Sequence, residues 1–407
     1  MRNKQLLHSM FYPEQFAKKR HVIHKLTDRF AKFGYQQVET PVFENYDLYN
    51  DVQGTVNTTD MLKLIDPSGE VLVLRPDATI PITRHYTNLQ NLETPGRLSY
   101  VLDIFRSTAE ERSRTQAGVE LFGERTPEAD AELIALAVTS LNEIKIPSFK
   151  IEIGHATFYK ELLHEANLNA IQQKQLDQYI QSKNISEIVP FLKELNLDPD
   201  LIKKLRKIPM LYGDTSMVIK EAENIISTDR MREELDYLSD VYQLLQDYHI
   251  ESYISINLGL INHMNYYSGI IFQGFAEGLG QPIMMGGRYD YLTHTFQQQT
   301  PAIGFAFEVD LLANLLYEMP EKTEVIELLY ESAERERAFI LAEQLRVFNK
   351  KIITRAAGES GSDLKAPNIF VKSKKSIYSN QKEQREFKTD QELLEWFLRK
   401  DVEKCNL

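Results

Sequence analysis

The chain has 407 residues, of which 43% are hydrophobic and 26% are charged. These values are typical of a globular protein, and they exclude a collagen, a coiled coil and a wholly disordered chain. At about 150 residues per domain, the length favours two or three domains. The formal net charge of −12 argues against a protein whose main task is to coat nucleic acid.

Charge is distributed unevenly along the chain. Residues 350–407 carry 13 basic and 9 acidic side chains, so a basic C-terminal segment follows an acidic body. Such a segment can contact RNA or an acidic partner, but a solvated surface is the simpler interpretation. We therefore do not expect nucleic acid among the partners.

The sequence predicts neither a membrane segment nor a metal site. No apolar run approaches the ~18 residues of a membrane helix, and Met1–Gln5 lacks the apolar stretch of a signal peptide. A single cysteine, Cys405, excludes a disulfide framework and favours a cytoplasmic location. The nine histidines show no spacing typical of metal ligands, and no nucleophile elbow is present. We expect no cofactor.

The first part of the chain alternates helical and strand patterns. Apolar residues recur at helical spacing from Phe16 to Phe33, and Gly34 follows where a helix typically ends. Two short apolar runs around Pro67 and Gly69 predict a hairpin. The predicted elements are a helix over 16–33, a strand interrupted by proline over 35–44, a hairpin of 62–64 with 70–74, a helix over 80–89, a longer hairpin of 98–106 with 117–123, a helix over 127–145 and a strand over 149–153.

Only helical periodicity is found from about residue 157 to 249, before strand patterns return. This arrangement predicts one α+β domain, residues 1–320, interrupted by a helical insertion. A small α/β domain, residues 321–407, follows. The predicted elements after the insertion are strands over 253–258, 269–275 and 282–285, a helix over 310–317, and then, in the C-terminal domain, a helix over 334–349, strands over 351–354 and 368–371 and a helix over 390–400.

The strand that begins at Gln116 has two different faces. Because side chains alternate along a strand, Ala117, Val119 and Leu121 point toward a core. Gln116 and Glu120 share the other face with a glycine, residue 118, between them. The missing side chain makes room for a ligand or for close backbone, whereas a solvated face is the alternative.

Two further segments contain polar residues beside turn or glycine signals. Asp77 and Thr79 precede a predicted helix, where either can simply cap it or contribute to a site. Arg106 ends a strand at the mouth of the longer hairpin, a position usually occupied by surface residues. The glycines of Gly286-Gly287-Arg288-Tyr289-Asp290 suggest backbone packed tightly near a site, and they match neither the Rossmann nor the P-loop pattern.

Taken in order, these segments resemble the catalytic core of class II histidyl-tRNA synthetases over about residues 10–317. The resemblance rests on Thr40–Glu44 (motif 1), Leu74–Thr79, Phe105-Arg106 with Gln116–Gly123 (motif 2), Asn265–Gly269, Gly286–Asp290, and Pro301–Phe307 (the start of motif 3). It implies a class II synthetase-like antiparallel sheet with flanking helices, a helical insertion and a small α/β C-terminal domain.

The chain departs from the synthetase pattern where the synthetases bind ATP. A catalytic arginine of the family is replaced within Asn262–Asn265, and Leu311 stands where motif 3 supplies an arginine. The motif 2 loop is shorter, and Glu308 adds negative charge nearby. Loss of two positive charges removes stabilisation of the reacting phosphates that is commonly worth several kcal/mol.

The residues that match the histidine-binding positions of the synthetases are retained. The resemblance implies a histidine site of Asp77, Thr79, Arg106, Gln116, Glu120, Tyr266 and Tyr267, and no catalytic residues. Glu120 is expected to accept from the imidazole and Arg106 to meet the carboxylate. Asp77, Gln116 and Thr79 are expected to hold the ammonium group, with the two tyrosines beside the ring.

Asp77 in an Arg-Pro-Asp-x-Thr string further resembles the regulatory subunits of short-form ATP phosphoribosyltransferase, which are synthetase paralogues in histidine biosynthesis. This implies a non-catalytic subunit that activates the short catalytic subunit, takes L-histidine as feedback inhibitor and forms a homodimer within a larger hetero-oligomer. An active histidyl-tRNA synthetase and a non-catalytic tRNA-binding paralogue are the alternatives.

Overall fold

The computed structural model describes residues 13–50, 52, 56–88, 95–107, 113–261, 267–316, 325–348, 350–357, 367–380 and 382–405. Contacts divide the chain into two compact units, Met1–Glu318 and Met319–Leu407, and each is described by itself. Across the described part of the chain, no helix is long and apolar enough to cross a membrane.

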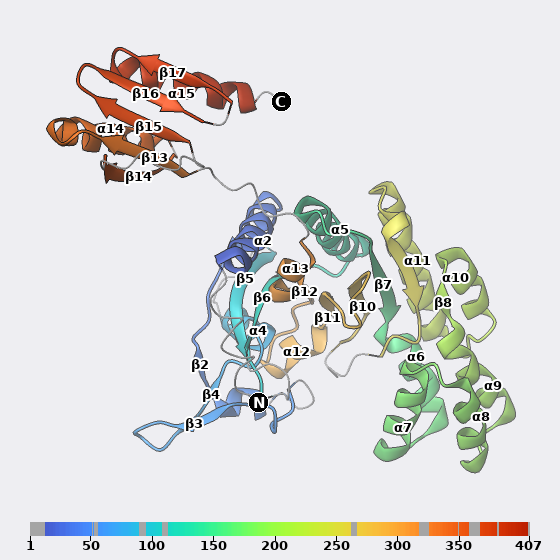
Figure 1. The fold of residues 1–407 in the computed structure, drawn as a ribbon. Helices are drawn as coiled ribbons and strands as arrows, with labels where there is room; N and C mark the ends of the chain where they lie inside the picture. The colour runs from blue at the N-terminus through green and yellow to red at the C-terminus, as the bar shows by residue number, and fades with distance from the viewer. Residues whose placement is uncertain are drawn as a thin grey trace, which may run out of the picture. The chain divides into compact units, whose positions relative to one another are not determined.

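The first unit is built on a nine-stranded sheet with the order β1-β5-β6-β12-β11-β10-β7-β9-β8 (Figure 1). The six strands from β5 to β7 in that order pair antiparallel. These strands are β1 (Gln36–Gln37), β5 (Gly96–Phe105), β6 (Ser113–Phe122), β7 (Phe149–His155), β8 (Tyr212–Gly213), β9 (Ile254–Asn257), β10 (Ile270–Ala276), β11 (Met284–Arg288) and β12 (Ala302–Glu308).

We predicted an antiparallel sheet, and the sheet is mixed. The short strand β1 pairs with β5 in parallel, and β9 pairs with β7 in parallel. Parallel pairing requires long crossover connections, which periodicity within one segment cannot reveal. The predicted architecture of one large sheet with flanking helices is confirmed.

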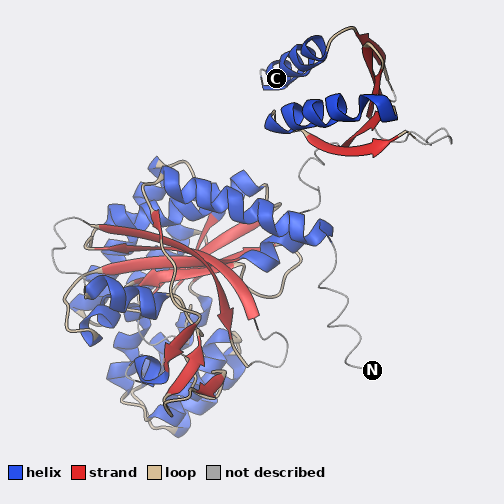
Figure 2. Cartoon of the chain, turned by 90° about the vertical axis from the view of Figure 1, so that its left-hand side faces the viewer, coloured by secondary structure: helices blue, strands red, loops and turns tan. Residues whose placement is uncertain are grey.

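Helices pack on both faces of this sheet (Figure 2). One core holds the apolar face of β6 together with α2, α5 and α13, whereas the opposite core holds residues of α3, α4 and α12. These helices are α2 (Pro13–Lys32), α3 (Tyr46–Asn50), α4 (Thr79–Thr87), α5 (Pro127–Ile144), α12 (Asp290–Thr295) and α13 (Val309–Leu315). The predicted alternation of β6 is confirmed, since Ala117, Val119 and Leu121 are fully buried.

A small antiparallel sheet, β2-β4-β3, precedes α4. Its strands are β2 (Phe43–Asn45), β3 (Lys63–Ile65) and β4 (Val71–Leu74). The predicted hairpin of β3 with β4 is confirmed, and the proline-interrupted segment divides between β1 and β2, which belong to different sheets.

The helical insertion leaves the sheet after β7 and returns at β9. Because these two strands are neighbours, the ends of the insertion lie close together. Its helices are α6 (Ala156–Ala166), α7 (Ala170–Gln181), α8 (Ile185–Glu194), α9 (Pro199–Lys207), α10 (Thr215–Glu223) and α11 (Asp229–Asp247). The expectation of helices alone was wrong at β8, whose two residues are too few to show alternation.

Within its described residues, the second unit has a five-stranded sheet with the order β14-β13-β15-β16-β17 and two α-helices. Its elements are β13 (Val325–Tyr330), α14 (Arg335–Val347), β14 (Lys351–Ala356), β15 (Asn368–Lys372), β16 (Lys375–Ser379), β17 (Gln384–Phe387) and α15 (Asp390–Cys405). The sequence predicted two of these strands and missed three. The polar sequence of β17 carries no strand pattern of its own, and its pairing with β16 makes it a strand.

Candidate functional site

Six of the seven residues predicted to bind a ligand line one pocket of about 100 Å³ in the first unit. The pocket lies on the polar face of β6, between β12, β11 and the start of α4. These six residues are Asp77, Thr79, Arg106, Gln116, Glu120 and Tyr267. The seventh, Tyr266, lies outside the described residues. The volume suits a ligand of several heavy atoms rather than a large cofactor.

Arg75 fixes the turn that brings the first two of these residues to the pocket. Its guanidinium is buried and donates to the carbonyl oxygens of Thr40 at 2.5 Å and Asp103 at 3.1 Å. These bonds join the segment before α4 to β5 and to the chain before β2. Asp77 and Thr79 are therefore held by a rigid connection rather than by a free loop.

Asp77 both caps a helix and lines the pocket. Its Oδ1 accepts a hydrogen bond of 2.9 Å from the backbone N–H of Ile80, in the first turn of α4. Asp77 therefore caps the first turn as one of the two predicted residues, although the N-cap position itself is Ala78, one residue later. Burial raises the pKa of this carboxyl, while the Ile80 N–H and the charge of Arg106 act in the opposite direction.

Glu120 lies at the centre of the site and is 1% exposed. Thr79 Oγ1 donates to its Oε1 at 2.7 Å, and the hydroxyl of Tyr289 donates to its Oε2 at 2.5 Å. Burial raises the pKa of Glu120 to about 8, although these two hydrogen bonds oppose the shift. Whether ionised or protonated, this carboxyl group keeps acceptor capacity beyond these two hydrogen bonds, so a ligand N–H can still donate to it.

Glycines make space for the buried groups around the pocket. A Cβ on Gly304 would overlap Glu120 Oε2 and lie 2.6 Å from the carbonyl oxygen of Val119. A Cβ on Gly118 would lie 2.5 Å from the carbonyl oxygen of Phe305 and 2.6 Å from the Tyr100 hydroxyl. The prediction that the glycine of β6 admits close backbone is confirmed.

Gln116 faces Glu308 across the ladder between β6 and β12. The amide Nε2 of Gln116 donates to Glu308 Oε1 at 2.8 Å. Burial raises the pKa of the Glu308 carboxyl, whereas Gln116, Arg114 and Arg106 oppose that shift.

The charged groups of the pocket are suited to a zwitterion. Two guanidinium groups, of Arg106 and Arg114, and three carboxyl groups line its wall. Arg106 Nε donates to the carbonyl oxygen of Pro76 at 2.9 Å, which anchors its guanidinium beside the pocket instead of in solvent. Arg106 therefore lines the pocket while remaining partly exposed.

Sequence reasoning missed several residues of this wall, chiefly Tyr100, Arg114 and Tyr289. Tyr289 belongs to the glycine-rich segment singled out in the sequence, so proximity to the two glycines was a usable signal. Arg114 lies on β6 itself, two residues before Gln116, so strand alternation was a usable signal for it as well. Tyr100 carried none, because only the pairing of β5 with β6 brings it beside residue 118. The packing predicted for the glycines is confirmed, since a Cβ on Gly287 would lie 2.7 Å from the Ile270 carbonyl oxygen.

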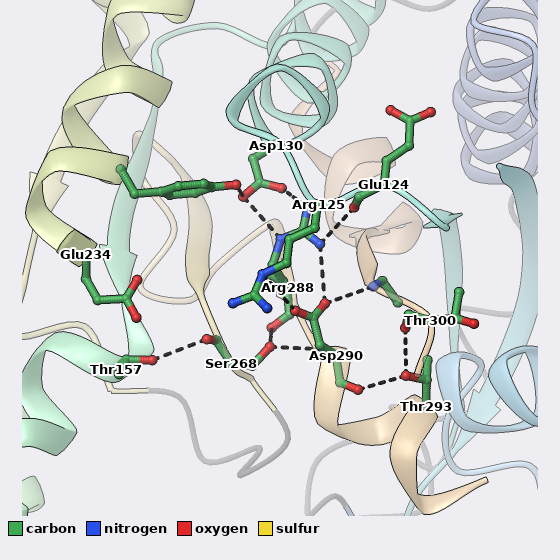
Figure 3. A network of polar contacts seen from close by, with 12 residues as sticks. Glu124, Arg125, Asp130, Thr157, Glu234, Ser268, Arg288, Asp290, Thr293 and Thr300 are labelled. Atoms are coloured by element: carbon green, nitrogen blue, oxygen red, sulfur yellow. Dashed lines mark hydrogen bonds and ion pairs between the residues drawn. The ribbon is translucent and has the colours of Figure 1, made fainter. Parts of the chain in front are cut away.

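Arg288, next to Tyr289, belongs to a structural network rather than to the pocket (Figure 3). It forms a buried ion pair with Asp130 of α5 and donates to the carbonyl oxygen of Glu124 at 3.0 Å. Tyr237 of α11 donates to Asp130 Oδ2 at 2.9 Å, and Asp290 accepts from Arg288 at 3.3 Å. The network joins β11, α5, α12 and the insertion behind the pocket.

Glu120 is expected to make the free energy of unfolding fall as pH rises. The unfolded carboxyl loses its proton near pH 4.5, whereas the folded one has a pKa of about 8. The folded chain therefore retains a proton that the unfolded chain has lost, so this stabilisation is complete below about pH 4.5 and lost as pH rises through about 8. Glu120→Gln removes the titration.

Denaturation of the wild type and Glu120→Gln at a series of pH values measures this effect. The stability of the variant relative to the wild type is expected to increase between roughly pH 5 and pH 9, by a few kcal/mol at most. Parallel pH profiles of the two proteins would contradict the raised pKa.

Comparison with known proteins assigns the fold to a class. The family model described as histidyl-tRNA synthetase matches residues 9–312. A histidyl-tRNA synthetase from Nostoc sp. PCC 7120 has a similar fold, with a TM-score of 0.79, 18% identity, and coverage of 96% of this chain and 97% of that one. The fold is that of the class II histidyl-tRNA synthetases.

Relatives with higher identity define the group within this class. The ATP phosphoribosyltransferase regulatory subunit of Oceanobacillus iheyensis is 54% identical over 364 residues, covering 88% of this chain and 90% of the relative. A Bacillus halodurans structure described as an ATP phosphoribosyltransferase regulatory subunit/histidyl-tRNA synthetase is 30% identical, with a TM-score of 0.78 and coverage of 86% and 92%. The chain belongs to the family of ATP phosphoribosyltransferase regulatory subunits.

Proposed function

We propose that this chain acts in the cytoplasm as the regulatory subunit of an ATP phosphoribosyltransferase, binds free L-histidine and carries no catalytic residue of its own. It activates a separate, short catalytic subunit at the first step of histidine biosynthesis. Histidine in the pocket acts as the feedback signal. A homodimer of the chain assembles with the catalytic subunit into a larger hetero-oligomer.

The observation that carries this proposal is the combination of a family relationship with the hydrogen bonding of the pocket. Relatives named as regulatory subunits match most of the chain, the first at 54% identity. In the pocket, Thr79 uses its hydroxyl hydrogen on Glu120, and Gln116 uses an amide hydrogen on Glu308. Both side chains can therefore offer oxygen lone pairs to an ammonium group, as a free amino acid requires.

The pocket offers a complementary group to each polar group of histidine. Asp77, Thr79 and Gln116 supply acceptors for the ammonium group, and Arg106 supplies a positive charge for the carboxylate. Glu120 accepts from the imidazole N–H, and Tyr267 lies beside the ring. Tyr289, already bonded to Glu120, holds the carboxylate of Glu120 in place for this contact.

The residues that replace the synthetase arginines support the proposed lack of catalysis. Leu311, on α13, packs against the hydrophobic core and has neither a charge nor a hydrogen-bond donor to offer a phosphate group. Glu308 places a carboxyl group in the pocket wall, which disfavours an approaching triphosphate. Asn262, in the second replaced segment, lies outside the described residues.

Mixing the purified chain with a short catalytic ATP phosphoribosyltransferase subunit tests the proposal. We expect co-elution on size exclusion, a rise in the phosphoribosyl transfer rate and inhibition of the complex by histidine. Separate elution with an unchanged rate would overturn the regulatory role. Histidine-dependent pyrophosphate exchange by the chain alone, above a heat-inactivated control, would favour the active synthetase instead.

A further inference from the structure

We propose that Glu308 is a positioning residue, which turns the side-chain amide of Gln116 so that its oxygen faces the ammonium group of the bound amino acid. The inference rests on the proposed function, because it concerns how the same pocket recognises histidine. It assigns a role in ligand recognition to Glu308, which the sequence analysis considered only as negative charge near the residues that bind ATP in the synthetases.

Strand pairing places the two side chains against each other. Glu308 is the last residue of β12, and Gln116 is its direct partner on β6. Directly paired residues project from the same face of a sheet, and here both line the pocket. The hydrogen bond from Gln116 Nε2 to Glu308 Oε1 is 2.8 Å long.

The chemistry of this hydrogen bond determines which end of the amide faces the ligand. A carboxylate only accepts hydrogen bonds, so it attracts the NH₂ end of the amide and repels the oxygen. The oxygen and the nitrogen lie on opposite sides of the amide carbon. With its nitrogen at Glu308, Gln116 therefore directs its oxygen away from β12.

A glutamine side chain without this hydrogen bond would not discriminate between an ammonium group and a carboxylate group. A free amide can rotate and present either NH₂ or oxygen, and its NH₂ group would repel an ammonium group while attracting a carboxylate. Fixing the amide in advance removes this ambiguity and lowers the entropy lost when the ligand binds. Glu308 thereby favours ligands that carry an ammonium group next to the side chain of Gln116.

A double-mutant cycle with three probe ligands tests the role. Calorimetry gives the affinity of L-histidine, of histamine, which keeps the amine but lacks the carboxylate, and of imidazole-4-propionate, which lacks the amine. Glu308→Ala is expected to weaken binding of the first two by about tenfold, the value of one hydrogen bond to a charged group. Binding of imidazole-4-propionate is expected to change by less than about twofold.

The cycle separates action through Gln116 from direct contact. If Glu308 acts through Gln116, then Gln116→Ala with Glu308→Ala binds histidine no more weakly than Gln116→Ala alone. Asp310→Ala serves as the matched control, since this nearby carboxyl group bonds to the backbone N–H of Thr115 and is not part of the pocket wall. Its histidine affinity is expected to equal that of the wild type.

The outcomes distinguish this inference from the proposed function. Additive effects in the cycle, or equal losses for all three probes, would overturn the positioning role while histidine binding by the wild type stands. A wild-type chain that binds no histidine would overturn the histidine pocket, and the positioning role with it.

Discussion

Replacing Glu120 by alanine is expected to weaken L-histidine binding by roughly ten- to a hundredfold. The carboxyl group of Glu120 is buried and held by Thr79 and Tyr289, so the substitution removes the acceptor proposed for the imidazole N–H from a fixed position in the pocket wall. Histidine can inhibit the complex only by binding one of its conformational states more tightly than another. A complex that binds histidine weakly should therefore also lose its sensitivity to inhibition by histidine. Activation of the catalytic subunit should persist.

Calorimetry of the chain and inhibition curves of the complex, each for wild type and variant, measure these effects. Glu128→Ala is a suitable control, since Glu128 is an exposed carboxyl group in the first turn of α5. Equal histidine affinity of the wild type and Glu120→Ala would remove Glu120 from the site. Loss of activation together with loss of binding would indicate that the substitution disrupts the subunit as a whole.

Replacing Arg288 by alanine is expected to destabilise the first unit by about 3–5 kcal/mol. The substitution would leave Asp130, whose side chain is 0% exposed, as an uncompensated buried charge beside Tyr237 and Asp290. The corresponding fall in Tm is on the order of 5–10 °C. Thermal denaturation followed by circular dichroism measures it.

Two further variants test whether the buried charge is the cause. Asp130→Asn added to Arg288→Ala removes that charge, and it should recover part of the lost stability. Arg125→Ala is the control, since its side chain is 69% exposed and its ion pair with Asp290 spans 3.7 Å. Because one partner of this long ion pair is exposed to solvent, we expect its loss to cost no more than about 1 kcal/mol. Equal losses for Arg125→Ala and Arg288→Ala would contradict the assignment.

Local pattern was sufficient for most elements of the first unit. The helix ending before Gly34, the two hairpins and the helix over 127–145 were predicted because their apolar spacing matches the face each buries. The polar face of β6 was equally visible, because strict alternation separates Gln116 and Glu120 from the apolar side chains between them. Elements without such a pattern, including β8 and β17, were missed.

The sequence by itself determined the class of the protein and six members of the pocket wall, because the motif residues stand in order and each carries a recognisable side chain. Only the tertiary structure decided how these residues are bonded. Pairing of β6 with β12 sets Glu308 against Gln116, and β11 carries Tyr289 to Glu120. The raised pKa of Glu120 is likewise a tertiary property, since burial by several distant segments causes it. Contacts between strands far apart in the chain leave no local periodicity, so no single segment of sequence contains them.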